Sequence, residues 1–208
     1  MPVIPLAFLI AVTTALAYFV GGLPFGYWFV RFSSGEDIRT TGSGNIGATN
    51  VHRTRGWKAG IVVLLLDICK GFLAVWIAGL LTGSNALALA LAAAAVMLGH
   101  CYPFLLGFKG GKAVACFVGA FLYLTPLALA VVLVIFVAIV VLSNYISLAS
   151  IAGAAIFPAV VWTVSHPPGP IFVASIFAAL LIIFRHKANV SRLLSGTENK
   201  FRRKGGKS

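Results

Sequence analysis

Long apolar stretches alternate with short polar breaks along the whole chain. Each stretch approaches the roughly twenty residues that an α-helix needs to cross the hydrocarbon of a bilayer. The breaks are rich in glycine, proline, asparagine and serine, which end or cap helices. The pattern predicts seven membrane-spanning helices, at about residues 1–30, 59–81, 86–106, 113–125, 126–143, 148–164 and 170–184.

The number of spans depends most on the run from 113 to 143. This run is too long for one perpendicular helix, and Pro126 would interrupt its hydrogen-bond ladder. The basic residues favour a division there. With seven spans, the loops after the first, third, fifth and seventh contain every Lys and Arg except Lys70. The positive-inside rule then places the N-terminus outside and the C-terminus in the cytoplasm.

Composition and charge narrow the class of protein. The 208 residues are 60% hydrophobic and 10% charged, with a mean hydropathy of +1.02, which excludes a soluble core. The net charge is +12, but the basic residues lie beside predicted spans and no soluble module presents them to nucleic acid. We therefore expect an all-α, polytopic integral membrane protein with anionic lipid or substrate partners. It forms one domain, 1–208, with a disordered basic tail at about 199–208.

The first candidate cluster is Gly42–Asn50, followed by Arg53, in the loop before the second span. Glycines let the backbone turn its N–H groups toward a ligand, and Ser, Thr and Asn add neutral donors. Arg53 supplies a charged fork that suits a phosphate. The glycine spacing fits neither a P-loop nor a dinucleotide-binding fingerprint. A flexible polar turn is the alternative.

The second cluster runs from Gly99-His100 to Phe108-Lys109-Gly110-Gly111-Lys112. Successive glycine N–H groups ahead of a helix can form an anion-binding concavity, and Lys112 would lie at its mouth. Lys109 could instead anchor the span at headgroup level. His100 could equally be an interfacial histidine with its hydrogen bonds satisfied.

The third cluster follows the last span. In a helix, His186, Asn189 and Arg192 would share one face, which could hold a hydroxylated phosphoester. Ser150 belongs to a weaker polar run at the start of the sixth span, where serines could also be helix caps. Asp67 and Lys70, inside the second span, have the spacing of an ion pair.

The residue inventory excludes several chemistries. Four acidic residues offer little material for a two-carboxylate hydrolase or a carboxylate metal site, so we expect no metal and no cofactor. The His–Asp dyad of the common glycerolipid acyltransferases is absent, and Cys101 has no recognisable Cys–His arrangement. The clusters instead favour direct transfer between two phosphate-bearing substrates, with orientation supplying much of the rate.

The three clusters resemble the signature motifs of the bacterial acyl-phosphate:glycerol-3-phosphate acyltransferases, the PlsY family. Their order, their spacing and the small seven-helix framework are also similar, over essentially the whole chain. Two residues depart from the family pattern. Ala113 stands where the family commonly has glycine, and Cys116 where it commonly has threonine.

The resemblance implies a specific reaction. An acyl phosphate would give its acyl group to the 1-hydroxyl of sn-glycerol 3-phosphate, producing lysophosphatidic acid and inorganic phosphate without a covalent acyl-enzyme. By the same resemblance, this reaction would be the first acylation of phospholipid synthesis. The resemblance further implies a bacterial inner-membrane location, an active site at the cytoplasmic face, and partnership with an enzyme that forms the acyl phosphate. A small anion transporter is the alternative from another class.

The resemblance also assigns roles to residues. Those that would cradle acyl phosphate are Ser43, Asn45, Thr49, Asn50, Gly110, Gly111 and Lys112. Those that would hold glycerol 3-phosphate are Arg53, Lys112, Ser150, His186 and Asn189. Arg192 and Glu198 would brace the third cluster, and we add Gly47 and His100 to the substrate-binding candidates. The catalytic candidates are Lys112, His186, Ser43 and Arg53.

Overall fold

The structure, a computed structural model, describes residues 4–201, and all regular elements within that range are helical. The longer helices are α1 Leu6–Gly21, α2 Phe25–Ser34, α4 Trp57–Thr82, α5 Ala86–Cys101, α6 Val114–Leu124, α7 Pro126–Ser143, α8 Ile146–Val160 and α9 Gly169–Arg185. The shorter elements are η1 Ile38–Thr40, α3 Ala48–Arg55, η2 Phe104–Leu106, the π-helical turn η3 Val161–Ser165 and α10 Lys187–Leu194.

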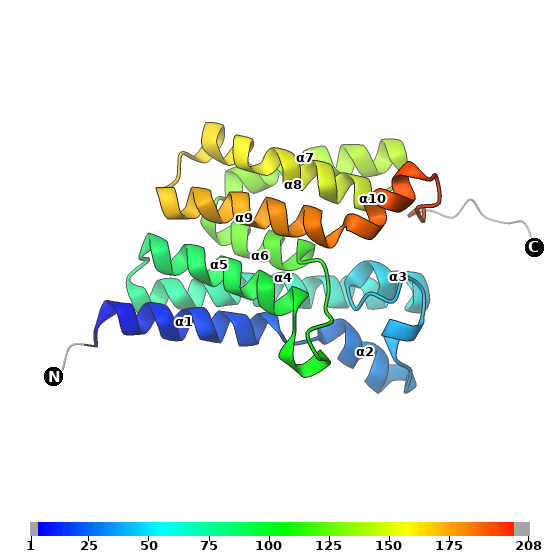
Figure 1. Ribbon diagram of the computed structural model, residues 1–208, viewed down its shortest axis with the longest axis horizontal. Helices are drawn as coiled ribbons and strands as arrows, with labels where there is room; N and C mark the ends of the chain where they lie inside the picture. The colour runs from blue at the N-terminus through cyan, green and yellow to red at the C-terminus, as the bar shows by residue number, and fades with distance from the viewer. Residues whose placement is uncertain (1–3, 202–208) are drawn as a thin grey trace, which may run out of the picture.

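Most of the helices form one elongated bundle. In Figure 1, α1 and α4 to α9 run roughly along the long axis, whereas α2, α3 and α10 gather at the end of the bundle nearest the C-terminus. The start of α1 and the end of α10 lie at opposite ends of the molecule. The segments that carry the first and third clusters therefore lie at this end, and the loop between α5 and α6, which carries the second, lies in the same half of the bundle.

The predicted breaks between helices are confirmed, because local sequence determines them. Pro126 is the first residue of α7, a position that needs no N–H donor. Asn144, with φ +62°, ends α7 in the left-handed region that asparagine tolerates. Asn85 caps α5, and its side-chain oxygen accepts the N–H groups of Leu87 and Ala88 at 3.1 and 3.2 Å.

We predicted seven membrane spans, but fewer helices of the structure meet the length and hydropathy that a span requires. Among residues 4–201, five segments are long and apolar enough to cross a bilayer: Leu6–Ser34, Trp57–Thr82, Ala86–Leu106, Pro126–Ser143 and Ile146–Ser165. A sixth arises if α9 and α10, which meet at a 56° bend, are taken together. The predicted fourth span is α6, which has only 11 residues.

Small residues let the helices approach closely. Helices α1 and α5 pack closely at Gly21 and Gly99, where an added Cβ would collide with the backbone of the facing helix. The same holds at Gly71 and Gly119, between α4 and α6. Farther along the bundle, the core is aromatic. The rings of Phe117, Phe121 and Phe157 pack together, with Phe157 edge-on to the other two at 4.7 and 4.8 Å.

We predicted a disordered tail from about residue 199, but its first residues contact the helices. The backbone N–H of Phe201 donates to the carbonyl of Asn144 at 2.7 Å, and its ring lies 5.3 Å from that of His52. Residues 199–201 therefore pack on the bundle at the end of α7. The rest of the predicted tail, 202–208, lies outside the described residues.

Candidate active site

A cavity of about 540 Å³ lies where α3, the start of α6 and α10 approach α4, α7 and α8. All three clusters contribute to its lining. Twelve of the candidate residues line it: Ser43, Asn45, Gly47, Thr49, Asn50, Arg53, His100, Lys112, Ser150, His186, Asn189 and Glu198. Gly110, Gly111 and Arg192 are not part of the lining and contact the site from outside it.

Asn50 shapes the first glycine-rich loop. Its side-chain oxygen accepts the N–H of Ser43 at 2.8 Å, and its Nδ2 donates to the carbonyls of Thr41 and Asn45 at 3.0 and 2.8 Å. Gly42 lies against this amide with φ +60°, and a Cβ there would collide with Asn50 Oδ1. Asn50 is 1% exposed, so its amide is committed to the loop itself.

The shaped loop places its other polar residues at the cavity. Ser43 and Thr49 line it, while the side chain of Asn45 accepts the N–H of Gly47 at 2.8 Å just before α3 begins. Arg53, on α3, donates through Nη2 to the carbonyl of Asn199 at 3.3 Å. The first cluster thus presents hydroxyl groups and one guanidinium to the same space.

The N–H groups of Gly110 and Gly111 do not face an anion, contrary to our expectation. They donate to the carbonyls of Cys101 and His100 at 3.1 and 2.9 Å. A Cβ at Gly111 would collide with the His100 ring, and one at Gly110 with the His100 carbonyl. These glycines are required because the loop lies directly against the end of α5.

Lys112 lies in the cavity just before α6. Its Nζ donates to Asn189 Oδ1 at 2.6 Å, which joins the second cluster to the third. Burial, reinforced by Arg192, Arg53 and Arg185, lowers the pKa of this ammonium from 10.5 to about 8, against the opposing effect of Glu198.

Ala113 connects Lys112 to α6 through a left-handed conformation. Its φ is +63°, and it is fully buried. This is the position at which the family that the chain resembles commonly has glycine, the residue that adopts such angles without steric cost. The backbone therefore keeps the shape that a glycine would allow, although the residue is alanine.

His186 occupies the bend between α9 and α10. Its Nδ1 lies 2.8 Å from the Ile182 carbonyl, which can only accept, so Nδ1 carries the proton and donates. This leaves Nε2 as the nitrogen free to meet a ligand. His186 and Asn189 are both buried and line the cavity, as their spacing predicted.

Glu198 connects the third cluster to α8. Oε1 accepts from Ser147 Oγ at 2.9 Å and from Asn189 Nδ2 at 2.8 Å, and Oε2 accepts from Arg192 Nε at 2.7 Å. Burial raises the pKa of this carboxyl, but the three donors outweigh it, so the net shift is downward. Glu198 is therefore a charged acceptor that orients Asn189, which in turn holds Lys112.

The two serines at the start of α8 have different partners. Ser147 contacts Glu198, as described above. Ser150 lines the cavity and donates to the carbonyl of Ile146 at 2.9 Å, one turn earlier in the same helix. Neither serine caps α8, because Tyr145 is the N-cap residue and makes no side-chain capping bond.

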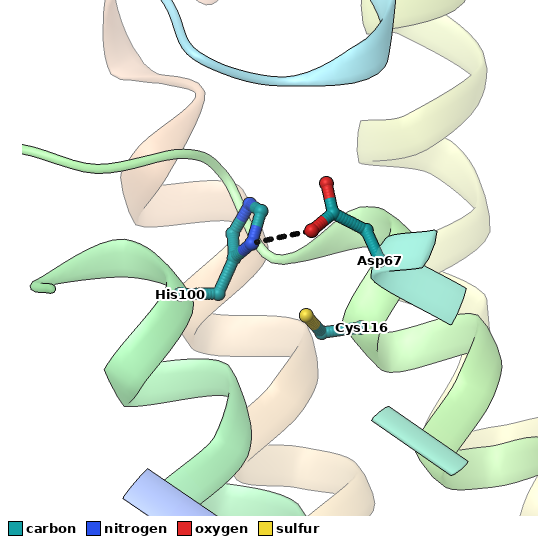
Figure 2. Close-up of side chains that lie close together, drawn as sticks. All are labelled: Asp67, His100 and Cys116. Atoms are coloured by element: carbon teal, nitrogen blue, oxygen red, sulfur yellow. Dashed lines mark ion pairs between the residues drawn. The ribbon is translucent and has the colours of Figure 1, made fainter. Parts of the chain in front are cut away.

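His100 of the second cluster also belongs to a buried polar group made of one residue each from α4, α5 and α6. Figure 2 shows Asp67 and His100 pointing toward each other, with Cys116 beside them. One ligand atom from each lies within 4.8 Å of the others, which would suit a soft metal ion. However, Lys70 Nζ lies 2.7 Å from Asp67 Oδ1, the oxygen that is 3.6 Å from His100 Nδ1.

Lys70 supplies the positive charge that a metal would otherwise bring to this group. Its Nζ also donates to the carbonyl of Leu23 at 2.8 Å, beside the break between α1 and α2. The predicted Asp67–Lys70 ion pair is thus confirmed, and it extends to His100 beneath the Gly110–Gly111 loop. We interpret the group as an ion-pair network that supports the loop.

The other end of the cavity is apolar. Its lining includes Val114, Phe117 and Val118 of α6, Val132, Leu133 and Phe136 of α7, and Ile61 and Leu64 of α4. Leu64 of α4 and Leu133 of α7 line this end and are 39% and 37% exposed, so the apolar end of the cavity is not enclosed. A cationic end joined to an apolar end suits an anionic ligand with a hydrocarbon tail.

Sequence reasoning missed Arg185 and Ser147 as parts of the site. Arg185 donates to the carbonyls of Gly110 and Gly111, and Ser147 donates to Glu198. The only sequence signal for Arg185 is that it precedes His186, and this position also suits an ordinary basic residue at a span end. Ser147 lies in the polar run that contains Ser150.

Comparisons with known proteins agree with this geometry. The family described as glycerol-3-phosphate acyltransferase matches residues 11–196. A glycerol-3-phosphate acyltransferase of Geobacter sulfurreducens is 45% identical over 191 residues, which cover 92% of this chain and 97% of the relative. One of Fusobacterium nucleatum is 41% identical over 189 residues, covering 90% and 95%.

Solved structures are similar over the same extent. The crystal structure of PlsY (YgiH), an integral membrane glycerol 3-phosphate acyltransferase, in its glycerol 3-phosphate form gives a TM-score of 0.88 at 35% identity, covering 93% of this chain and 96% of that one. The lysophosphatidic acid form gives 0.84 at 33% identity, covering 92% and 94%. The protein is a multi-pass membrane protein, and by family, sequence and fold it belongs to the glycerol-3-phosphate acyltransferases.

Proposed function

We propose that this protein transfers a fatty acyl group from acyl phosphate to the 1-hydroxyl of sn-glycerol 3-phosphate, releasing lysophosphatidic acid and inorganic phosphate. The supporting observation is the cavity itself, because the three clusters and Ser150 converge at a polar end that continues into an apolar end. A water-soluble phosphoester and a phosphate with a hydrocarbon tail could meet there. Family membership supports the same acceptor.

The proposed arrangement follows the charges. The acyl phosphate headgroup lies between the Ser43–Thr49 loop and Lys112, with its chain directed toward α6 and α7. Glycerol 3-phosphate lies between Arg53, Ser150, His186 and Asn189, all of which line the same cavity. Lys112 and Asn189 touch, so the two substrates would be adjacent. Holding both reactants in this way supplies much of the rate.

In the proposed step, the glycerol hydroxyl oxygen attacks the carbonyl carbon of the mixed anhydride. The new ester C–O bond forms as the bond to the phosphate oxygen breaks, and phosphate leaves with the electron pair. Lys112 stabilises the oxyanion. The donor's own phosphate accepts the hydroxyl proton, while His186 Nε2 holds the acceptor substrate. No side chain becomes acylated.

His186→Gln tests the proton acceptor. We expect the KM for glycerol 3-phosphate to rise about tenfold while kcat changes less than about threefold, because the imidazole binds the substrate rather than removing its proton. Steady-state kinetics with both substrates varied would measure this. A large loss of kcat at unchanged KM would instead make His186 the base.

We also propose a topology and a location. The chain crosses the inner membrane of a bacterium seven times, with α6 as a short crossing, the N-terminus outside and the C-terminus in the cytoplasm. The sidedness of Lys and Arg supports this topology, because a six-span topology would separate the tail from the other basic loops. The active site then faces the cytoplasm, where an enzyme that forms acyl phosphate could supply the donor.

The deciding experiment incubates purified protein with labelled glycerol 3-phosphate and either palmitoyl phosphate or palmitoyl-CoA. We expect labelled lysophosphatidic acid only with palmitoyl phosphate. Product formed from palmitoyl-CoA would contradict the proposed donor. No product with either donor, together with uptake of glycerol 3-phosphate into vesicles, would favour the transporter instead.

A further inference from the structure

We infer that Arg185 is a positioning residue that fixes the backbone of the Lys112 loop, and with it the placement of the acyl phosphate. This inference rests on the proposed function. Arg185 is the last residue of α9, directly before His186. Its Nε donates to the carbonyl of Gly111 at 3.0 Å, and its Nη2 donates to the carbonyl of Gly110 at 3.1 Å.

These two hydrogen bonds determine the direction of neighbouring N–H groups. A trans peptide is planar, so the carbonyl of one residue and the N–H of the next point in opposite directions. By holding the Gly111 carbonyl, Arg185 turns the N–H of Lys112 away from α9. The peptide between Gly110 and Gly111 is held on both sides, by Arg185 at its oxygen and by the His100 carbonyl at its nitrogen.

The loop needs this restraint because glycines are free to turn. A Gly-Gly pair can adopt many backbone angles, and ordering it in one conformation costs more entropy than ordering other residues. The guanidinium is planar and its donors have a fixed spacing, so it can hold two carbonyls at once. A lysine at this position could donate to the same oxygens but could not hold both in one plane.

Arg185 is itself held in place by an aromatic ring. Its guanidinium carbon lies 4.9 Å from the ring centroid of Tyr102, and the Tyr102 carbonyl accepts from Tyr18 at 2.8 Å. Within residues 4–201, Arg185 forms no ion pair with a carboxylate. The hydrogen bonds that its Nε and Nη2 donate both go to the loop.

The arrangement also connects the two substrates. One helix end supplies His186 to the proposed glycerol 3-phosphate side and Arg185 to the acyl phosphate side. A shift of the loop would move Lys112 relative to Asn189, which it contacts at 2.6 Å. Displacement of a reacting group by about 1 Å can reduce a rate about a hundredfold.

The test compares Arg185→Gln and Arg185→Lys with Lys187→Gln, a control that removes a neighbouring exposed cation. We expect both Arg185 variants to lower kcat/KM for palmitoyl phosphate by about tenfold or more, with the KM for glycerol 3-phosphate changed less than about threefold. The control should match the wild type. Because lysine keeps the charge, a similar loss in both variants assigns the effect to the two-carbonyl contact.

Full activity of Arg185→Lys would overturn the inference, and so would a rise in the KM for glycerol 3-phosphate as large as that in the KM for palmitoyl phosphate. If neither Arg185 variant gives a cooperative melting transition, Tyr102→Leu serves instead, because it removes the ring beneath the guanidinium but leaves its donors. We then expect a smaller loss in the same parameter, and unchanged kinetics would contradict the inference. Inactive wild-type protein would contradict the proposed function rather than the role of Arg185.

Discussion

Lys112→Ala is expected to lower turnover at least about a hundredfold, the typical effect of removing one oxyanion donor. The loss should be largest in kcat, because the ammonium interacts most strongly with the charge that develops in the transition state. It also removes the hydrogen bond to Asn189 Oδ1. Steady-state assays with palmitoyl phosphate and glycerol 3-phosphate would measure it. Near-normal turnover with unchanged Michaelis constants would mean that Lys112 has been assigned the wrong role.

The pH dependence should identify the same group. The pKa of Lys112 is lowered by burial to about 8, so its charged fraction falls as the pH rises through that value. If the ammonium is required, kcat/KM should decrease above about pH 8, well before an ordinary lysine would lose its proton. Lys112→Arg keeps the charge at these pH values. Its residual activity should therefore lack this decrease, whereas an identical decrease would point to another group.

Glu198→Ala is expected to have the largest effect on stability. The buried carboxylate accepts hydrogen bonds from Ser147, Asn189 and Arg192, and its removal leaves these donors without their partner. Leaving a buried donor without its partner costs about 1–3 kcal/mol, and Ser147 and Asn189 are both buried. Because Asn189 also holds Lys112, activity should fall together with the melting temperature.

The control for this change is Glu36→Ala. Glu36 also pairs with an arginine, Arg55, but its side chain is 53% exposed, and exposed pairs contribute about 0–1 kcal/mol. Thermal unfolding in detergent would compare the two variants. The contribution of Glu198 requires its charged form, whose pKa is lowered, so it is present at neutral pH and is lost on acidification. Equal melting temperatures for the two variants would contradict the structural role of Glu198.

The sequence predicted the helix ends well because they depend on local chemistry. Pro126, Asn144 and Asn85 each end or begin a helix through their own backbone or side-chain preferences. The sequence also predicted that the three clusters lie near one another, because basic loops are expected on the same side of a membrane. The span count was less predictable, since α6 has only 11 residues and a break at Gly22–Pro24 divides the first apolar stretch.

The details of the site depend on partners that are distant in the chain. The N–H groups of Gly110 and Gly111 bind carbonyls at the end of α5, and no sequence pattern marks a carbonyl as a partner. Arg185 likewise carried no signal beyond its position before His186, because its partners are backbone carbonyls rather than a carboxylate. Asn50 lines the cavity, but the commitment of its amide to the loop follows only from the folded contacts.

The open apolar end of the cavity has a consequence for kinetics. Leu64 of α4 and Leu133 of α7 line this end and remain exposed. A fatty tail can therefore remain dissolved among the lipids while its headgroup reacts. The concentration that governs the rate is then the mole fraction of donor per lipid or detergent molecule, so diluting the donor within micelles should slow the enzyme even at constant total amount.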